Sequence, residues 1–284
     1  LGWLESNEII AEFIISGVGF YYFFAHSFTT PSPFIQFALF KDRNFVTGCI
    51  FMTVMGLVLY STMALASPYL QNVIGYPIIT AGMLLATRGF GTFLAMMMVG
   101  RLMRFIEART LIVSGLAMTA GSLFQMTGWT DLTQVPEIVA VSIIQGFGFG
   151  LVFVPLSTVS FLTLPSHLRT EGTSMLTLLR NVASSIGISI VTAMLTRNIQ
   201  INHAELAEKM VPWNPALKAA LPGAVAGDPA SLMKLDQLVN LQGLMVAYVD
   251  DFKLMMIITL AAIPLAKMQK KPVATATPVT VHAD

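Results

Sequence analysis

Four polar side chains lie inside long apolar stretches of this sequence, where they could face a ligand. Arg88 lies in the stretch LATRGFG, Gln145 opens a glycine-rich stretch, and Arg180 is followed directly by Asn181. A buried ionisable group in a bilayer is costly and generally faces a cavity or a partner. We therefore expect these four residues to face a central cavity. For the two arginines, a structural role in capping carbonyls at broken helix segments stays open.

Two acidic residues near these stretches have simpler explanations. Glu171 begins an apolar stretch, where a negative charge suits the N-terminal end of the helix dipole. Glu12 lies near the start of the first stretch and is expected to be solvated. Neither arginine therefore has an evident carboxylate partner within the apolar stretches.

Glycines recur where helices could pack closely. Small residues let helices approach each other in lipid, and proline bends a helix where neighbours satisfy the freed carbonyl. The predicted packing and kink positions are Gly89, Gly91, Gly100, Gly146, Gly148, Gly150 and Pro155. The glycine spacing is not a dinucleotide-binding fingerprint, because no strand precedes it and no acidic residue follows in a βαβ unit.

Other site chemistry finds no support. The sequence has a single cysteine, Cys49, and no apolar stretch holds a His-x-x-x-His pair or an acidic cluster, so no metal site is predicted. No stretch places a histidine beside an acid that could activate a serine or threonine. The sequence therefore predicts that the protein is not an enzyme.

The elements that must position these residues are membrane helices. Of the 284 residues, only 11% are charged, against roughly a quarter in soluble domains, and 55% are hydrophobic. Together with a mean hydropathy of +0.73, this excludes a soluble enzyme domain or a nucleic-acid binder. A bilayer needs about 20 apolar residues per helix. The matching stretches predict an all-helical integral membrane protein with seven spans, at 9–28, 45–66, 78–102, 110–128, 137–164, 171–196 and 252–268.

The basic residues predict the orientation. Lysine, arginine and histidine residues follow spans one, three, five and seven, whereas the connections 67–77 and 129–136 contain no lysine or arginine. By the positive-inside rule, the basic side and the C-terminus are cytoplasmic. The long connection 197–251 then lies outside, and its stretches 202–210 and 230–248 are amphipathic. We expect the second to lie on the membrane surface or against the bundle, with a docking site for a partner as the alternative.

Several motifs together resemble one transporter family. They are Lys-Asp-Arg-Asn at 41–44, Tyr-Leu-Gln-Asn-Val-Ile-Gly-Tyr at 69–76, Ala-Gly at 81–82 with Arg88-Gly89, the run 100–109, the run 145–156, and Arg-Thr-Glu-Gly at 169–172 with Arg180-Asn181. Over roughly residues 1–271 the chain resembles the fourteen-helix drug:proton antiporters of the major facilitator superfamily, the EmrB/QacA type.

The resemblance implies a place for this chain in a longer protein. Residues 1–43 would be a linker transmembrane helix and cytoplasmic loop, 44–271 the C-terminal six-helix bundle with its outer loop 197–251, and 272–284 a disordered cytoplasmic tail. The N-terminal bundle would be missing, and a start at Leu1 rather than Met fits a fragment. The cytoplasmic loop signature would be Gly100, Arg101, Arg104 and Arg109. It departs from the family pattern because Met103, not Asp, precedes Arg104, so the gating role of that Asp does not carry over.

The function implied by the resemblance is proton-coupled efflux of lipophilic or cationic toxic compounds by alternating access. The proton gradient would supply the energy, with no cofactor. The implied location is the bacterial inner membrane. The implied partners are drugs or toxins, protons, the lipid bilayer, the missing N-terminal bundle, and a periplasmic membrane-fusion adaptor with an outer-membrane channel, as in Gram-negative relatives.

Two other functions stay open. The two intramembrane arginines suit an anionic substrate, which favours a carrier for a specific organic anion, fatty acid or siderophore. From a different class, the chain could be a non-transporting membrane scaffold whose outer loop docks a periplasmic adaptor.

Overall fold

The computed structural model describes residues 6–29, 36–211, 213–225 and 227–268, and within these ranges the chain forms helices and their connections. The predicted disordered tail 272–284 lies outside the described residues. The elements in chain order are α1 (Asn7–Thr29), η1 (Phe37–Lys41), α2 (Arg43–Asn72), α3 (Ile78–Leu102), α4 (Ala108–Met126), α5 (Val135–Leu162), η2 (Ser166–Leu168), α6 (Arg169–Lys209), α7 (Pro215–Ala220), α8 (Pro222–Val225), α9 (Pro229–Ala262) and η3 (Ile263–Met268).

The predicted spans correspond to helical segments, although 110–128 and 137–164 each extend two residues past the ends of α4 and α5. By length and composition, α1, α2, α3, α5 and the segment Ser166–Lys209 that contains α6 are apolar enough to cross a membrane. α4 and α9 are not among these segments: the sequence of α4 includes several polar residues, and Asp250, Asp251 and Lys253 lie within the apolar part of α9. Membrane crossing by these two helices stays a prediction.

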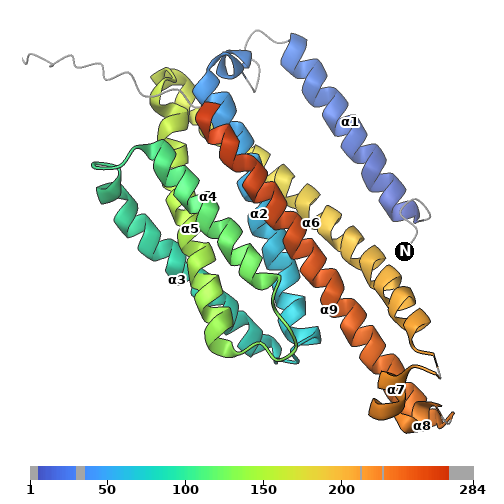
Figure 1. Cartoon of the computed structure of the whole chain (residues 1–284). Helices are drawn as coiled ribbons and strands as arrows, with labels where there is room; N and C mark the ends of the chain where they lie inside the picture. Colours follow the sequence, from blue (N-terminus) through green and yellow to red (C-terminus); the bar gives the residue numbers. More distant parts are fainter. Residues whose placement is uncertain (1–5, 30–35, 212, 226, 269–284) are drawn as a thin grey trace, which may run out of the picture.

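The long outer connection is largely helical, and its second amphipathic stretch packs against the bundle helix α6, one of the two expected arrangements. Residues 230–248 form no separate surface helix, because α9 runs without a break from the outer connection through the predicted last span. Likewise, residues 202–209 are the end of α6, which has 41 residues. α6 and α9 therefore form a hairpin, capped by α7 and α8, that continues past the other bundle helices (Figure 1). The hydrophobic pattern of the two stretches is explained by their packing against each other.

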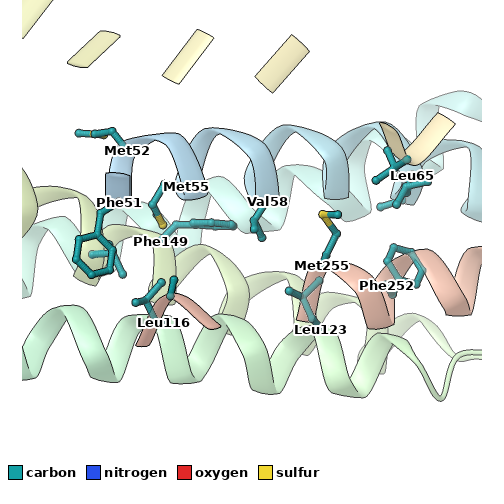
Figure 2. Packing of buried hydrophobic residues seen from close by; sticks show 14 of the residues in the cluster. Phe51, Met52, Met55, Val58, Leu65, Leu116, Leu123, Phe149, Phe252 and Met255 are labelled. Carbon is teal, nitrogen blue, oxygen red and sulfur yellow. The ribbon is translucent and has the colours of Figure 1, made fainter. Parts of the chain in front are cut away.

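Six helices make one bundle. α5 packs between α3 and α4, α2 packs along α6 and also touches α5 and α9, and α9 lies against both α4 and α6. Side chains from α2, α4, α5 and α9 fill the centre, including Phe51, Leu116, Phe149 and Met255 (Figure 2). This shared core makes the bundle the folded unit of the chain.

α1 lies apart from the bundle (Figure 1). Its most apolar window has no buried residue, and large side chains such as Phe13, Phe20 and Tyr21 are exposed. Apolar surface of this size is stable only in lipid or against another apolar partner. α1 therefore needs lipid or another apolar partner to cover it, and its assignment as a linker helix stays a prediction.

Local sequence signals define the ends of α2. The Asp42 carboxylate accepts hydrogen bonds from the backbone N–H groups of Asn44 (2.8 Å) and Phe45 (3.0 Å), which caps the helix start. After the helix, Gly75 adopts a φ of +85°, a left-handed conformation that favours glycine. The chain can therefore turn sharply into α3.

Asp228 caps the start of α9, and we predict that the hairpin depends on it. Its carboxylate accepts hydrogen bonds from the Ser231 hydroxyl (2.7 Å) and backbone N–H (3.0 Å), and these bonds hold the pKa of Asp228 below its ordinary value. A lowered pKa means that the cap is complete above the unfolded-state pKa and weakens as the pH falls through the folded-state pKa. Asp228→Ala should increase proteolysis near residue 230 relative to the wild type at neutral pH, and the difference should narrow as the pH falls and the wild-type cap weakens.

Asp228→Asn is the matched control, because asparagine also caps helices but does not titrate in this range. It should keep the helix start protected at both neutral and acidic pH. Equal proteolysis of the wild type, the alanine variant and the asparagine variant would show that the cap does not hold the hairpin.

Candidate functional site

The packing of α3 on α5 brings two of the predicted residues into one region. The backbone carbonyl of Arg88 lies where a side chain on Gly146 would begin, directly after Gln145. The Thr92 hydroxyl donates a hydrogen bond across this contact to the Gly146 carbonyl oxygen (3.0 Å). The helix backbones are therefore in direct contact at the level of Arg88 and Gln145.

Both side chains are buried and lack partners for several polar atoms. Arg88 is 6% exposed, and its Nε and Nη1 atoms have no hydrogen-bond partner in the described part of the chain. Gln145 is fully buried, and neither its amide oxygen nor its amide nitrogen is paired within the same part. Unpaired buried polar atoms cost about 1–3 kcal/mol each, so each of these atoms calls for a partner such as a water, an ion or a ligand. The two residues thus offer donors and an acceptor from adjacent helices.

The other two predicted residues lie on a different helix pair. Arg180 on α6 is half-buried, and its backbone and side chain pack against Gly56 of α2. Asn181, the next residue, is exposed. The structure therefore places Arg88 and Gln145 at the α3–α5 contact and Arg180 at the α2–α6 contact. The role of all four in facing a substrate remains a prediction.

The apolar face of α6 beside Asn181 is accessible. Leu178, Val182, Ile186 and Ile190 repeat every four residues and are exposed. Next to them lies a shallow hollow of about 510 Å³, lined by Ser185, Ile186, Ser189, Ile190, Ala193 and Met194. α3 likewise exposes Met83, Phe90, Phe93 and Met97. Exposed apolar faces of this size are stable in lipid or against an apolar partner.

The glycines divide into two groups. A side chain on Gly91, Gly148 or Gly150 would overlap atoms of a neighbouring helix, as at Gly146, so these positions need glycine for close approach. At Gly89 and Gly100 nothing lies within 4 Å of the added atom. These two glycines lie on a different face of α3 from Gly91, and their role in helix packing stays a prediction. Pro155 is buried within an unbroken α5, and the kink stays a prediction.

The predicted loop signature surrounds a short turn between α3 and α4. Gly100 and Arg101 lie at the end of α3, Arg104 is exposed in the turn, and half-buried Arg109 lies at the start of α4.

Glu171 lies in the first turn of α6 as expected, and its carboxylate accepts a hydrogen bond from the Gln36 amide (3.1 Å). Within the described ranges, no group of three histidine, cysteine or acidic residues could hold a metal ion.

The sequence analysis missed one buried acidic residue. Asp251 was placed at the end of the outer connection, yet it lies inside α9 and is fully buried. The available signal was periodic: Tyr248, Phe252 and Met255 are buried on the same helix, and Asp251 falls three or four residues from Tyr248 and Met255. An acidic residue at a core position of an apolar helix is a candidate site by itself.

The comparison with known families identifies the chain. The family model of the Major Facilitator Superfamily matches residues 9–197, which covers the bundle helices α2 to α5 and most of α6. The chain belongs to the Major Facilitator Superfamily. This superfamily consists of multi-pass membrane transporters, so the superfamily indicated by the motifs is confirmed.

Similar relatives include drug exporters. The chain is 28% identical over 281 residues to the multidrug export protein EmrB of Escherichia coli K12, covering 96% of this chain and 54% of that protein. It is 25% identical over 275 residues to the fatty acid resistance protein FarB of Neisseria gonorrhoeae, with the same coverages of 96% and 54%. These similarities confirm the predicted likeness to the EmrB type. The chain spans about half the length of these relatives.

A solved structure supports the fold. A bacterial homologue of the human lysosomal transporter Spinster, in an inward-facing and occupied conformation, aligns with a TM-score of 0.57 at 20% identity. The alignment covers 81% of this chain and 50% of that one. The all-helical bundle therefore has the fold of half a major facilitator transporter.

Proposed function

We propose that this chain is the C-terminal half of a proton-coupled multidrug efflux transporter in the bacterial inner membrane. The observation that carries the proposal is the similarity to EmrB along 96% of the chain, within a matched transporter family. Alternating access needs two bundles that move about a midplane site, and this chain supplies one. Lipophilic or cationic compounds would lie between the halves, against the exposed apolar faces of α3 and α6.

The proposal includes an orientation and partners. The turn between α3 and α4 with Arg101 and Arg104, together with the C-terminus, would face the cytoplasm. The α6–α9 hairpin would then extend into the periplasm, where a membrane-fusion adaptor linked to an outer-membrane channel would dock. α1 would be a linker helix at the edge of the bundle, which fits its separation from the other helices.

A second candidate substrate class is supported by two observations. The fatty acid resistance protein FarB is similar over the same share of the chain, and buried nitrogen atoms of Arg88 and Arg180 are unpaired in the described part. Cationic groups of this kind suit an organic anion such as a fatty acid carboxylate. This candidate keeps the transporter fold and changes only the cargo.

The test is efflux from proteoliposomes that contain the intact transporter and an imposed proton gradient. If multidrug export is correct, a lipophilic cationic dye is exported, lipophilic cations compete, and fatty acids do not. Arg88→Ala should then change dye efflux less than severalfold. If fatty acids compete and Arg88→Ala or Arg180→Ala abolishes that competition, the anion carrier replaces the multidrug proposal. Residues 1–284 alone are the control and should give no efflux, because one bundle has no opposing half.

A further inference from the structure

Two neighbouring carboxylates on α9 have opposite environments. Asp250 is half-exposed and accepts a hydrogen bond from Lys253 Nζ at 3.0 Å, which forms an ion pair. Asp251 is fully buried, and neither of its oxygen atoms has a hydrogen-bond partner in the described ranges. Asp250 therefore pairs with a lysine at the surface, whereas the side chain of Asp251 lies in the protein interior.

An aromatic cluster packs around the part of α9 that carries Asp251. We define this cluster as Tyr69 of α2, Trp129 of the α4–α5 connection, and Tyr248 and Phe252 of α9. The ring centroids lie 5.4 Å apart for Tyr69 and Tyr248, 6.1 Å for Tyr69 and Phe252, and 6.0 Å for Trp129 and Phe252. All four rings are nearly or fully buried. Asp251 therefore lies in a helix segment that closely packed rings shield from water.

No cation in the described ranges balances Asp251. On α9 itself, the charged group that acts on Asp251 is Asp250, which has the same sign, and Lys253 is already paired with Asp250. Tyr248 also interacts electrostatically with Asp251, but its hydroxyl is hydrogen-bonded with the Asn72 side chain.

The neighbouring helices offer no counter-ion either. From α2, Tyr69 is the titratable group in the cluster, and its hydroxyl is unpaired within the described part. In α4 the ionisable side chain is Arg109, the second residue of the helix, and no ionisable side chain follows it in the helix. On α6, Arg197 is exposed, and His203 lies 3.6 Å from Asp236.

An ionised carboxylate without a partner is unstable in such surroundings, whereas the neutral acid is tolerated. Proton binding converts the carboxylate and one H⁺ from solvent into a carboxylic acid, and release returns the same H⁺ to solvent. No other bond forms or breaks. Of the two neighbouring acids, Asp250 is therefore suited to the ionised form in its ion pair with Lys253, and Asp251 is suited to hold a proton.

We propose that Asp251 is a proton-binding site of this bundle, occupied in the packed arrangement seen here and emptied when the aromatic cluster opens to water. The use of this proton in transport rests on the proposed function. The protonation itself does not, because it follows from the burial of Asp251 within the chain.

Infrared spectroscopy of the purified chain in lipid nanodiscs tests the site without any transport measurement. At neutral pH, the wild type should show the carbonyl stretch of a protonated carboxylic acid that exchanges slowly in D₂O. Asp251→Asn should lose this signal, and Asp250→Asn, the matched control, should keep it. Absence of the signal in the wild type, or its persistence in folded Asp251→Asn, would overturn the proposal.

A second variant keeps the test decisive if Asp251→Asn does not fold. Asp251→Glu retains a carboxylic acid but should shift the carbonyl stretch, whereas a signal from any other residue would stay at the wild-type frequency. An unshifted signal in this variant would contradict the assignment to Asp251.

The role in transport has its own readout. In the intact transporter, Asp251→Asn should lose proton-driven efflux, and Asp250→Asn should retain it. If the wild type shows the infrared signal but no proton-driven efflux, the proposed function fails and the proton site stands. If the infrared signal is absent while efflux is proton-driven, the proton site fails and the proposed function stands.

Discussion

Trp129→Ala should destabilise the bundle by about 3–5 kcal/mol, the usual cost of removing a large aromatic side chain from a core. Trp129 is 1% exposed, and its ring lies 5.6 Å from that of Tyr69 and 6.0 Å from that of Phe252. It comes from the α4–α5 connection and therefore joins that connection to α2 and α9. Its removal leaves a cavity where three separate segments meet. Thermal unfolding of the purified chain in detergent measures the loss.

Trp213→Ala is the matched control for this prediction. Trp213 lies in the connection between α6 and α7 and is 74% exposed. Exposed positions of this kind usually change stability by no more than about 0.5 kcal/mol. If both substitutions lower the unfolding temperature equally, the aromatic cluster does not hold the bundle together.

Much of the fold could be predicted from local signals. Every apolar stretch of about 20 residues became a helix, because no other regular structure satisfies the backbone across a bilayer within a single segment. The start of α6, at Arg169 with Glu171 in its first turn, also followed from a local rule, the preference for an acidic residue near a helix N-terminus. These predictions depended on residues close together in the chain.

The hairpin was less predictable because its helices depend on each other. The stretch 230–248 has an amphipathic pattern that suits a membrane surface, but the same pattern suits a partner helix. In the structure the partner is the end of α6: Gly243 of α9 lies against the backbone of Asn202 and His203, and the Asn202 side chain donates a hydrogen bond to the Gly243 carbonyl (3.4 Å). The hydrophobic periodicity of the stretch is the same for a helix on the membrane surface and for a helix paired with residues about 40 positions away, so the sequence does not distinguish them.

The candidate site shows the same limit. The local sequence identified Arg88 and Gln145 as unusual, because they are polar residues within apolar stretches. Their proximity depends on how α3 meets α5, which sequence periodicity does not specify. Asp251 was missed for a related reason: it lies at the boundary between a charged and an apolar stretch, and only tertiary packing shows that it faces inward. Asp250, one residue earlier, faces the other way.

The α3–α5 contact leads to the second large effect, expected for Gly146→Ala. A Cβ atom at this position would overlap the backbone carbonyl of Arg88, and backbone cannot move aside as a flexible side chain can. The helices must separate, which breaks the hydrogen bond from Thr92 to Gly146 and displaces Arg88 from Gln145. Overpacking of this kind costs about 1–3 kcal/mol.

Gly89→Ala, on the same α3 helix as Arg88, is the control for Gly146→Ala, because an added Cβ at Gly89 meets nothing within 4 Å. Alanine is the better helix former, so this variant should unfold at the same temperature as the wild type or slightly higher. In the intact transporter, Gly146→Ala should also reduce efflux, since the separation of α3 from α5 disturbs the packing of the whole bundle. A Gly146→Ala variant as stable and as active as Gly89→Ala would mean that the close contact of α3 and α5 does not position Arg88.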